Sequence, residues 1–207
     1  MKHFISILIL LVSVVMFTSC NENKSDNNST VVESPSNESE IGGISEESIF
    51  NLTTTWITEE NETIQLKDLK GKTLVMVMIY TTCKAACPRL VADMRNIEAK
   101  IQESKLKDIH FILVSIDPET DTPKRLKEFA IENFMDEDHW MFLQGTESGV
   151  REFANVLAVK YKQISPMDFS HSNIISVFNS GGELIHQREG LRVDNKETVQ
   201  TILELTH

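Results

Sequence analysis

The sequence predicts an α/β sandwich in which helices flank a central mixed sheet. Two continuous apolar runs, residues 73–80 and 109–116, have the composition of strands that are buried on both faces. Between them, residues 88–105 place apolar side chains on one helical stripe, which predicts a β-α-β unit with parallel strands and a right-handed crossover. A hairpin pattern at residues 173–187 adds an antiparallel pair, so the sheet is expected to be mixed.

The remaining elements follow from turn residues, helix caps and periodicity. Thr122 and Pro123 mark the start of a helix, as its N-cap and its first helical residue. Gly181 and Gly182 belong to the turn of the C-terminal hairpin. The expected elements are an N-terminal hairpin within 48–72, a helix at 121–134, a strand at 140–145, a helix at 148–159, the hairpin at 173–187, and a last helix that contains Val199, Ile202 and Leu203.

Residues 1–19 have the layout of a secretory signal. Lys2 supplies a positive charge, an apolar run covers residues 4–17, and two small residues lead into Cys20. The run is shorter than the roughly 20 residues of a membrane-spanning helix. The arrangement resembles a bacterial lipobox, which implies that Cys20 is lipidated and anchors the protein to a bacterial membrane. An ordinary cleaved signal and an uncleaved anchor are the alternatives, and all three place the rest of the chain outside the cytoplasm.

Residues 20–47 are rich in Asn, Ser, Glu and Gly and contain no aromatic residue. Such a segment cannot bury enough apolar surface to offset its ordering entropy, so it is interpreted as a flexible tether. Residues 48–207 are long enough for one domain with a full core. The formal net charge of the chain is −11, which argues against nucleic acid as a partner.

Two of the three cysteines, Cys83 and Cys87, lie four residues apart after the first buried strand. Pro88 follows the second of them and is favoured at the first position of a helix, which predicts that Cys87 is the helix N-cap. Free backbone N–H groups and the helix dipole favour a thiolate at that position, so the pKa of Cys87 is expected to be low.

Such a pair is compatible with three kinds of chemistry. A structural disulfide is possible outside the cytoplasm, although closing so small a loop adds little stability. A redox couple is the second possibility, because two cysteines at this spacing could form and break a disulfide. The third is a soft metal site, suited to Cu(I) first and to Zn(II) second, and three intervening residues give a metal room between the sulfurs.

Four segments in the same order resemble the SCO/SenC family, the copper chaperones of cytochrome oxidase assembly. The first is CKAACP after an apolar strand, which is similar to the CxxxCP signature of the family. The others are VSIDPETDTPKRLKEFA at 114–130, WMFLQG at 140–145, and FSHSNIISVFNSGGELI at 169–185. The resemblance covers roughly residues 50–205. It implies a thioredoxin-like fold and a copper site whose ligands are Cys83, Cys87 and His171, for Cu(I) and also for Cu(II).

The resemblance implies a membrane-tethered chaperone that delivers copper to the binuclear copper centre of cytochrome c oxidase. Its partners would be the oxidase subunit that carries this centre, a thiol reductant protein, and the lipid membrane through Cys20. The alternative is an enzyme, a thiol-disulfide reductase that acts on the copper-site cysteines of the oxidase and uses Cys83 and Cys87 as its redox pair. No residue is assigned a catalytic role outside this alternative.

Three aspartates are candidates for tuning the site or docking a partner: Asp117, Asp121 and Asp168. For Asp117 and Asp121, ordinary loop and capping roles are an equal alternative. Family members commonly have Asp directly before the histidine, whereas this chain has Ser170 there, with Asp168 three residues upstream of His171. Because neighbouring groups orient metal-binding imidazoles, this departure bears on the orientation of His171.

Four other residues are interpreted without a functional role. Tyr80 is expected to serve in packing, and His139 and His186 are expected at the surface. Met167 could offer a soft contact near His171, but methionine more often fills gaps in a core.

Overall fold

A computed structural model of the chain describes residues 44–166 and 168–206. The predicted signal at residues 1–19, the lipidation site at Cys20, most of the predicted tether, and Met167 lie outside the described residues. Among those described, no helix is both long and apolar enough to cross a membrane.

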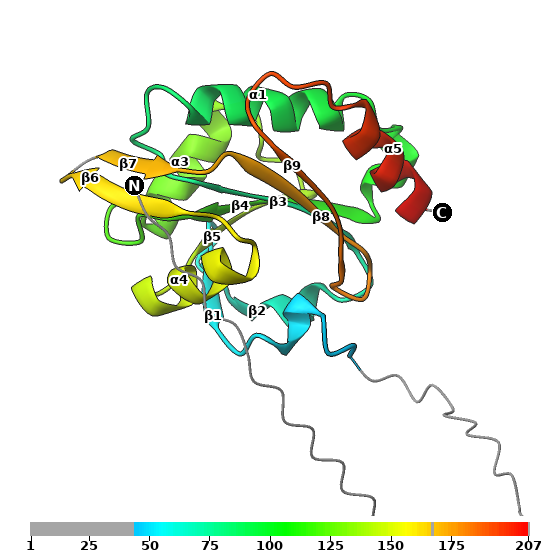
Figure 1. The fold of residues 1–207 in the computed structure, drawn as a ribbon, viewed down its shortest axis with the longest axis horizontal. Coiled ribbons are helices and arrows are strands. Elements are labelled where there is room, and N and C mark those ends of the chain that lie inside the picture. The colour runs from blue at the N-terminus through cyan, green and yellow to red at the C-terminus, as the bar shows by residue number, and fades with distance from the viewer. Residues whose placement is uncertain (1–43, 167, 207) are drawn as a thin grey trace, which may run out of the picture. The chain divides into compact units, whose positions relative to one another are not determined.

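The main sheet of the described chain has seven strands in the order β2-β1-β5-β4-β3-β8-β9 (Figure 1). The central strands β3, β4 and β5 are parallel to one another, and the outer pairs are antiparallel. The predicted mixed sheet is therefore confirmed. The strand bounds are β1 Thr55–Thr58, β2 Thr63–Gln65, β3 Thr73–Ile79, β4 Ile109–Ser115, β5 Trp140–Gln144, β8 Ile174–Phe178 and β9 Leu184–Glu189.

The helices lie on both faces of this sheet. Right-handed crossovers place α1 and α3 on the same face, and α5 packs against β8 and β9. Figure 1 shows α4 on the opposite side of the sheet from α1. The bounds are α1 Cys87–Glu98, α2 Glu103–Leu106, α3 Pro123–Glu132, α4 Glu147–Val156 and α5 Lys196–Leu205, with 3-10 turns η1 Ile49–Asn51 and η2 Leu66–Leu69.

The core explains why the two apolar runs become central strands. Every residue of β3 is buried, and all residues of β4 except His110 are buried. A strand covered by helices on both faces must be apolar on both faces, as these runs are. On the α4 side, the fully buried ring of Trp56 packs edge-on against Phe153, with ring centroids 5.5 Å apart.

The predicted C-terminal hairpin is confirmed as β8 and β9. Its turn closes where the backbone N–H of Gly182 donates to the carbonyl of Asn179 at 2.9 Å. Gly182 has a φ of +81°, and a Cβ there would lie 2.5 Å from Ser48 Oγ. Glycine is needed at this position both for the backbone conformation and for the close approach of η1.

Two features of the local structure differ from the sequence-based expectation. The helix expected at 88–105 ends at Glu98, and a separate short helix, α2, begins at Glu103. Two strands were not predicted at all, β6 (Tyr161–Ser165) and β7 (Asp168–His171). These pair antiparallel as a separate two-stranded sheet, which we call the ribbon. The ribbon is the element that carries His171.

Candidate metal centre

The cysteine loop follows the carboxyl end of β3 and leads into α1. The backbone N–H of Cys83 donates to the carbonyl of Tyr80 at 3.3 Å, which turns the chain sharply after the strand. Cys87 is the first residue of α1, and its N–H donates to Cys83 Sγ at 3.3 Å. Both cysteines are free thiols, with Cys87 only 1% exposed and Cys83 partly exposed.

The prediction that Cys87 is the helix N-cap was wrong. Ala86 occupies that position, and its carbonyl accepts the first helical hydrogen bond, from the N–H of Leu90 at 3.0 Å. The helix therefore starts one residue earlier than Pro88 suggested. One of the free N–H groups at the start of the helix, that of Cys87 itself, donates to Cys83 Sγ.

The expected acidity is consequently reversed between the two thiols. Burial raises the pKa of Cys87 well above its ordinary value, and the nearby charges of Cys83 and Asp121 raise it further. Burial also opposes ionisation of Cys83, but the hydrogen bond from the N–H of Cys87 and the polar hydroxyl of nearby Tyr80 outweigh it, so the pKa of Cys83 is lowered. The acidic thiol is therefore the partly exposed one.

His171 reaches the cysteine loop from the ribbon. Its Nε2 lies 3.8 Å from Cys87 Sγ, and its Nδ1 lies 3.0 Å from the carbonyl of Ser172. A carbonyl can only accept, so Nδ1 carries the proton and donates it. In the neutral ring Nε2 then presents a lone pair toward Cys87. Burial lowers the pKa of His171, with the Ser172 bond opposing it, which favours this neutral, metal-binding form.

The sheet register explains why a residue so distant in sequence arrives here. Strand β8 runs antiparallel to β3, with Val77 opposite Ile175. Continuing that register along β3 brings the start of β8 to the carboxyl end of β3, where the cysteine loop begins. His171 lies three residues before β8, so the imidazole is delivered beside the loop.

Asp121 holds the other side of the cysteine loop. Its carboxylate is fully buried and accepts bonds from the N–H and the hydroxyl of Thr81 and from the hydroxyl of Ser115, the last at 2.6 Å. Burial is the main reason that its pKa is raised. The loops after β3 and β4 leave neighbouring parallel strands at the same edge of the sheet, which is why these residues meet. Asp117 is also buried and lies in the same loop as Asp121.

Asp168 contacts the site through Tyr80. The hydroxyl of Tyr80 donates to Asp168 Oδ1 at 2.5 Å, and the ring of Tyr80 lies edge-on to the ring of His171, with centroids 5.8 Å apart. The interpretation of Tyr80 as packing alone was therefore incomplete. Ser170 stands beside His171 in the ribbon and is exposed.

His139 and His186 lie outside the centre, but neither is a free surface group. His139 is 8% exposed, and its Nε2 lies 2.5 Å from Glu98 Oε1 before the amino end of β5, at the other edge of the sheet. His186 is partly buried and hydrogen-bonds to Thr198 Oγ1 at 3.0 Å. The expectation that His139 is at the surface was wrong.

Two hollows flank the ribbon. A pocket of about 390 Å³ is lined by His171, Ser170, Tyr161 and neighbouring residues. A cleft of about 630 Å³ is lined by Asp117, Tyr161, Phe169 and parts of α4. Neither cysteine lines either hollow. His171 is therefore the member of the centre that borders an open pocket.

The chain has a thioredoxin-like fold, with a pair of thiols at the start of a helix and a neutral imidazole beside them. These features define a class of dithiol proteins in which two sulfurs and one nitrogen form a soft set of metal donors. The model of the SCO1/SenC family matches residues 44–207. The chain belongs to the SCO1/SenC family.

A curated relative, the SCO1 protein homolog of Bacillus subtilis, is 35% identical over 101 residues. This match covers 48% of the present chain and 52% of the relative, so the chain spans about half the length of that relative.

Three solved structures have the same fold. A SCO1/SenC family lipoprotein from Bacillus anthracis is 23% identical with a TM-score of 0.68, covering 76% of this chain and 95% of that one. BsSco, described as a Sco-family cytochrome c oxidase assembly protein with a disulfide switch, is 26% identical with a TM-score of 0.62, covering 73% and 90%. Yeast Sco1 with copper bound is 20% identical with a TM-score of 0.60, covering 73% and 84%.

Proposed function

We propose that this chain is a copper chaperone that binds copper through Cys83, Cys87 and His171 and delivers it to the binuclear copper centre of cytochrome c oxidase. The observation that carries the proposal is the approach of His171 Nε2 to Cys87 Sγ at 3.8 Å, with the proton of the ring on Nδ1. Two sulfurs and one imidazole nitrogen form a soft set that suits Cu(I), and the imidazole also suits Cu(II).

The protonation of the centre fits a metal that is taken up and released. Cys83 ionises readily, whereas Cys87 holds its proton until a cation displaces it. A site that must expel a proton binds copper less tightly as the pH falls. Transfer to a partner proceeds by exchange of ligands, and a three-ligand site that borders a surface pocket leaves room for an incoming ligand.

The comparisons support the proposal at different levels. Family membership is the broadest support for copper as cargo. BsSco is described as a cytochrome c oxidase assembly protein, which supports the oxidase as the recipient. Yeast Sco1 has been solved with copper bound, and its likeness to this chain concerns the fold.

The second candidate is a thiol-disulfide reductase, and the unequal thiols favour it. The Cys83 thiolate would attack a disulfide of the oxidase copper site, forming a mixed disulfide and releasing one target thiol. Cys87 would then lose its proton and attack Cys83, which releases the second target thiol and leaves a Cys83–Cys87 disulfide. A thiol reductant protein would restore the pair. Reactivity of this kind follows thiolate fraction and access, so it has no obligatory use for His171.

We further propose that the chain works outside the cytoplasm, anchored to a bacterial membrane by lipid on Cys20, with residues 20–47 as a tether to the domain at 48–207. The layout of the first 20 residues supports this proposal, and a lipoprotein of the same family has the same fold.

The chaperone is tested in cells that lack the native gene and carry a variant copy, grown at low copper. His171→Ala should fail to assemble the oxidase, as should the Cys83→Ser, Cys87→Ser double variant. His186→Ala is the matched control, because that imidazole contacts Thr198 and not the thiols. The readout is the absorption of the assembled oxidase in isolated membranes. Normal assembly by His171→Ala would contradict the chaperone and favour the reductase.

A further inference from the structure

The main sheet brings the chain near the cysteine loop, but His171 itself lies outside that sheet. The ribbon forms a sheet of its own, and no strand of the main sheet pairs with β6 or β7 in the described chain. Its two strands are exposed or only partly buried along their length. Something other than a strand ladder must therefore hold the imidazole at the cysteine loop.

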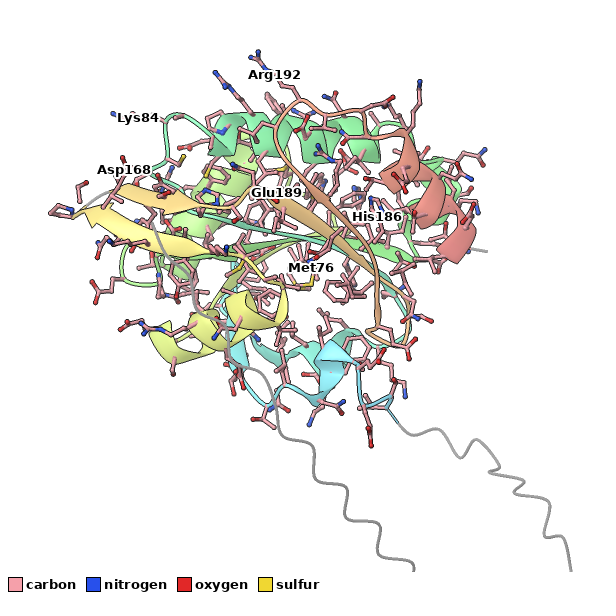
Figure 2. All side chains as sticks on the ribbon, in the orientation of Figure 1. Met76, Lys84, Asp168, His186, Glu189 and Arg192 are labelled. Atoms are coloured by element: carbon pink, nitrogen blue, oxygen red, sulfur yellow. The ribbon has the colours of Figure 1, made fainter. Side chains whose placement is uncertain are left out.

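Tyr80 makes that connection from the end of β3. Its side chain is 2% exposed, and its hydroxyl donates to Asp168 Oδ1 at 2.5 Å. The same oxygen accepts the backbone N–H of Phe169 at 3.3 Å. Figure 2 shows Asp168 on β7, on the side of the molecule where the loop of Lys84 also lies.

The ring of Tyr80 contacts the inward side chains of β7. Its centroid lies 5.2 Å from that of Phe169 and 5.8 Å from that of His171, the latter edge-on. Tyr80 thus touches three of the four residues of β7. It lies three residues before Cys83, and Asp168 lies three residues before His171. The single hydroxyl links the two chain segments that carry the ligands.

We infer that Tyr80 is a positioning residue, which holds His171 over the cysteine loop through its bonds to Asp168 and Phe169. The inference rests on the proposed function for its consequence, because a histidine held in place binds copper without a further ordering step. It also gives Asp168 a role at this site, as the acceptor for the hydroxyl of Tyr80.

The first test needs no metal. Amide hydrogen exchange is measured on the reduced, copper-free full-length chain for wild type and Tyr80→Phe. The N–H of Phe169, which loses its acceptor, should exchange roughly 2- to 10-fold faster, as expected for one lost neutral hydrogen bond, while the amides of β3 stay unchanged. Tyr161→Phe is the control. Tyr161 is the only other tyrosine in the sequence and lies in β6 of the ribbon, so this variant makes the same chemical change at a different place. An unchanged rate for Phe169 in Tyr80→Phe would overturn the inference.

The second test is a cycle of copper affinities with a competing Cu(I) chelator. One lost neutral hydrogen bond corresponds to roughly a 2- to 10-fold change, so Tyr80→Phe should weaken binding by about that factor. Asp168→Ala should act in the same direction, and Tyr161→Phe should not. In a His171→Ala background, Tyr80→Phe should have no further effect, because its role is to hold that imidazole.

The outcomes separate the two claims. An equal loss from Tyr80→Phe with and without His171 would show that Tyr80 acts on Cys83 directly, which overturns the positioning role. Wild-type affinity in His171→Ala would overturn the ligand assignment and the proposed function. If that happened, faster exchange of the Phe169 N–H in Tyr80→Phe would still support Tyr80 as the residue that holds the ribbon.

Discussion

The Nε2 of His171 lies 3.8 Å from the Sγ of Cys87, although 84 residues separate them in the sequence. The cysteine comes from the first turn of α1 and the imidazole from the ribbon, and the antiparallel pairing of β8 with β3 brings them together. The proton on Nδ1 leaves Nε2 free as a ligand. This relationship is the basis of the copper proposal.

Cys83 should react with an alkylating reagent at lower pH than a free cysteine, whose pKa is about 8.5. Hydrogen bonds to its sulfur lower its pKa, whereas burial raises that of Cys87 and shields it. Labelling of the reduced chain, read at each cysteine by mass spectrometry across a pH series, checks this. Labelling of Cys87 before Cys83 would show that Cys83 is not the more acidic thiol.

Asp121→Asn should lower the free energy of unfolding by about 1–3 kcal/mol, because an amide cannot accept all the bonds that the buried carboxylate accepts. The donors left without a partner belong to Thr81 and Ser115. Urea unfolding measures the change. Asp117→Asn makes the same chemical change in the same loop and should cost less. Equal stability of Asp121→Asn and wild type would remove the structural role of this carboxylate.

Cys20→Ser should abolish incorporation of a fatty-acid analogue and release the protein from membranes. The motivation is the small-residue site that precedes Cys20 after a short apolar run. Metabolic labelling followed by detergent partition checks both results. Cys83→Ser serves as the control and should keep its label. Label that persists in Cys20→Ser would rule out lipidation at this position.

Much of the fold could be predicted because its central strands are apolar on both faces. The apolar runs at residues 73–80 and 109–116 predicted buried strands, and β3 and β4 confirm them. Thr122 caps α3 as expected, and its hydroxyl accepts the N–H of Arg125. The ribbon gave no comparable signal. Its side chains are polar or exposed, so no apolar alternation marks its strands. Pro88 fits either the first or the second position of a helix. The sequence therefore did not distinguish Cys87 from Ala86 as the N-cap of α1, and the start of the helix was misplaced by one residue.

The sequence predicted some residues of the site better than others. Spacing alone pointed to Cys83 and Cys87 as a reactive pair, but His171 came from the family resemblance. Their protonation depends on which N–H groups face which sulfur, and sequence does not contain that information. The hydrogen bond from Tyr80 to Asp168 joins residues 88 positions apart, and no sequence pattern predicted it.

Glu98→Gln should destabilise the protein by about 1 kcal/mol at neutral pH, because Glu98 accepts from Trp140 Nε1 at 2.8 Å and pairs with His139. Burial opposes ionisation of Glu98, but these partners outweigh it and lower its pKa. A carboxyl whose pKa is lower in the folded state stabilises the fold above its unfolded pKa of about 4.3 and loses this effect as the pH falls through the folded value.

The difference in unfolding free energy between wild type and Glu98→Gln should therefore be full at pH 7 and shrink below about pH 4. Urea unfolding at several pH values measures it. Glu103→Gln, at an exposed position of α2, is the control. A difference that grows toward acid would contradict the direction assigned to the pKa of Glu98.

The most direct test of the copper centre is the Cu(I) affinity of the reduced full-length chain, wild type against His171→Ala, measured by competition with a chelator. Loss of a group that hydrogen-bonds directly to a metal ligand typically changes affinity by about 10- to 100-fold, so losing the ligand itself should cost about 100-fold or more. Reactivity of the dithiol with a model disulfide should stay close to wild type. Unchanged copper affinity in His171→Ala would contradict the three-ligand centre.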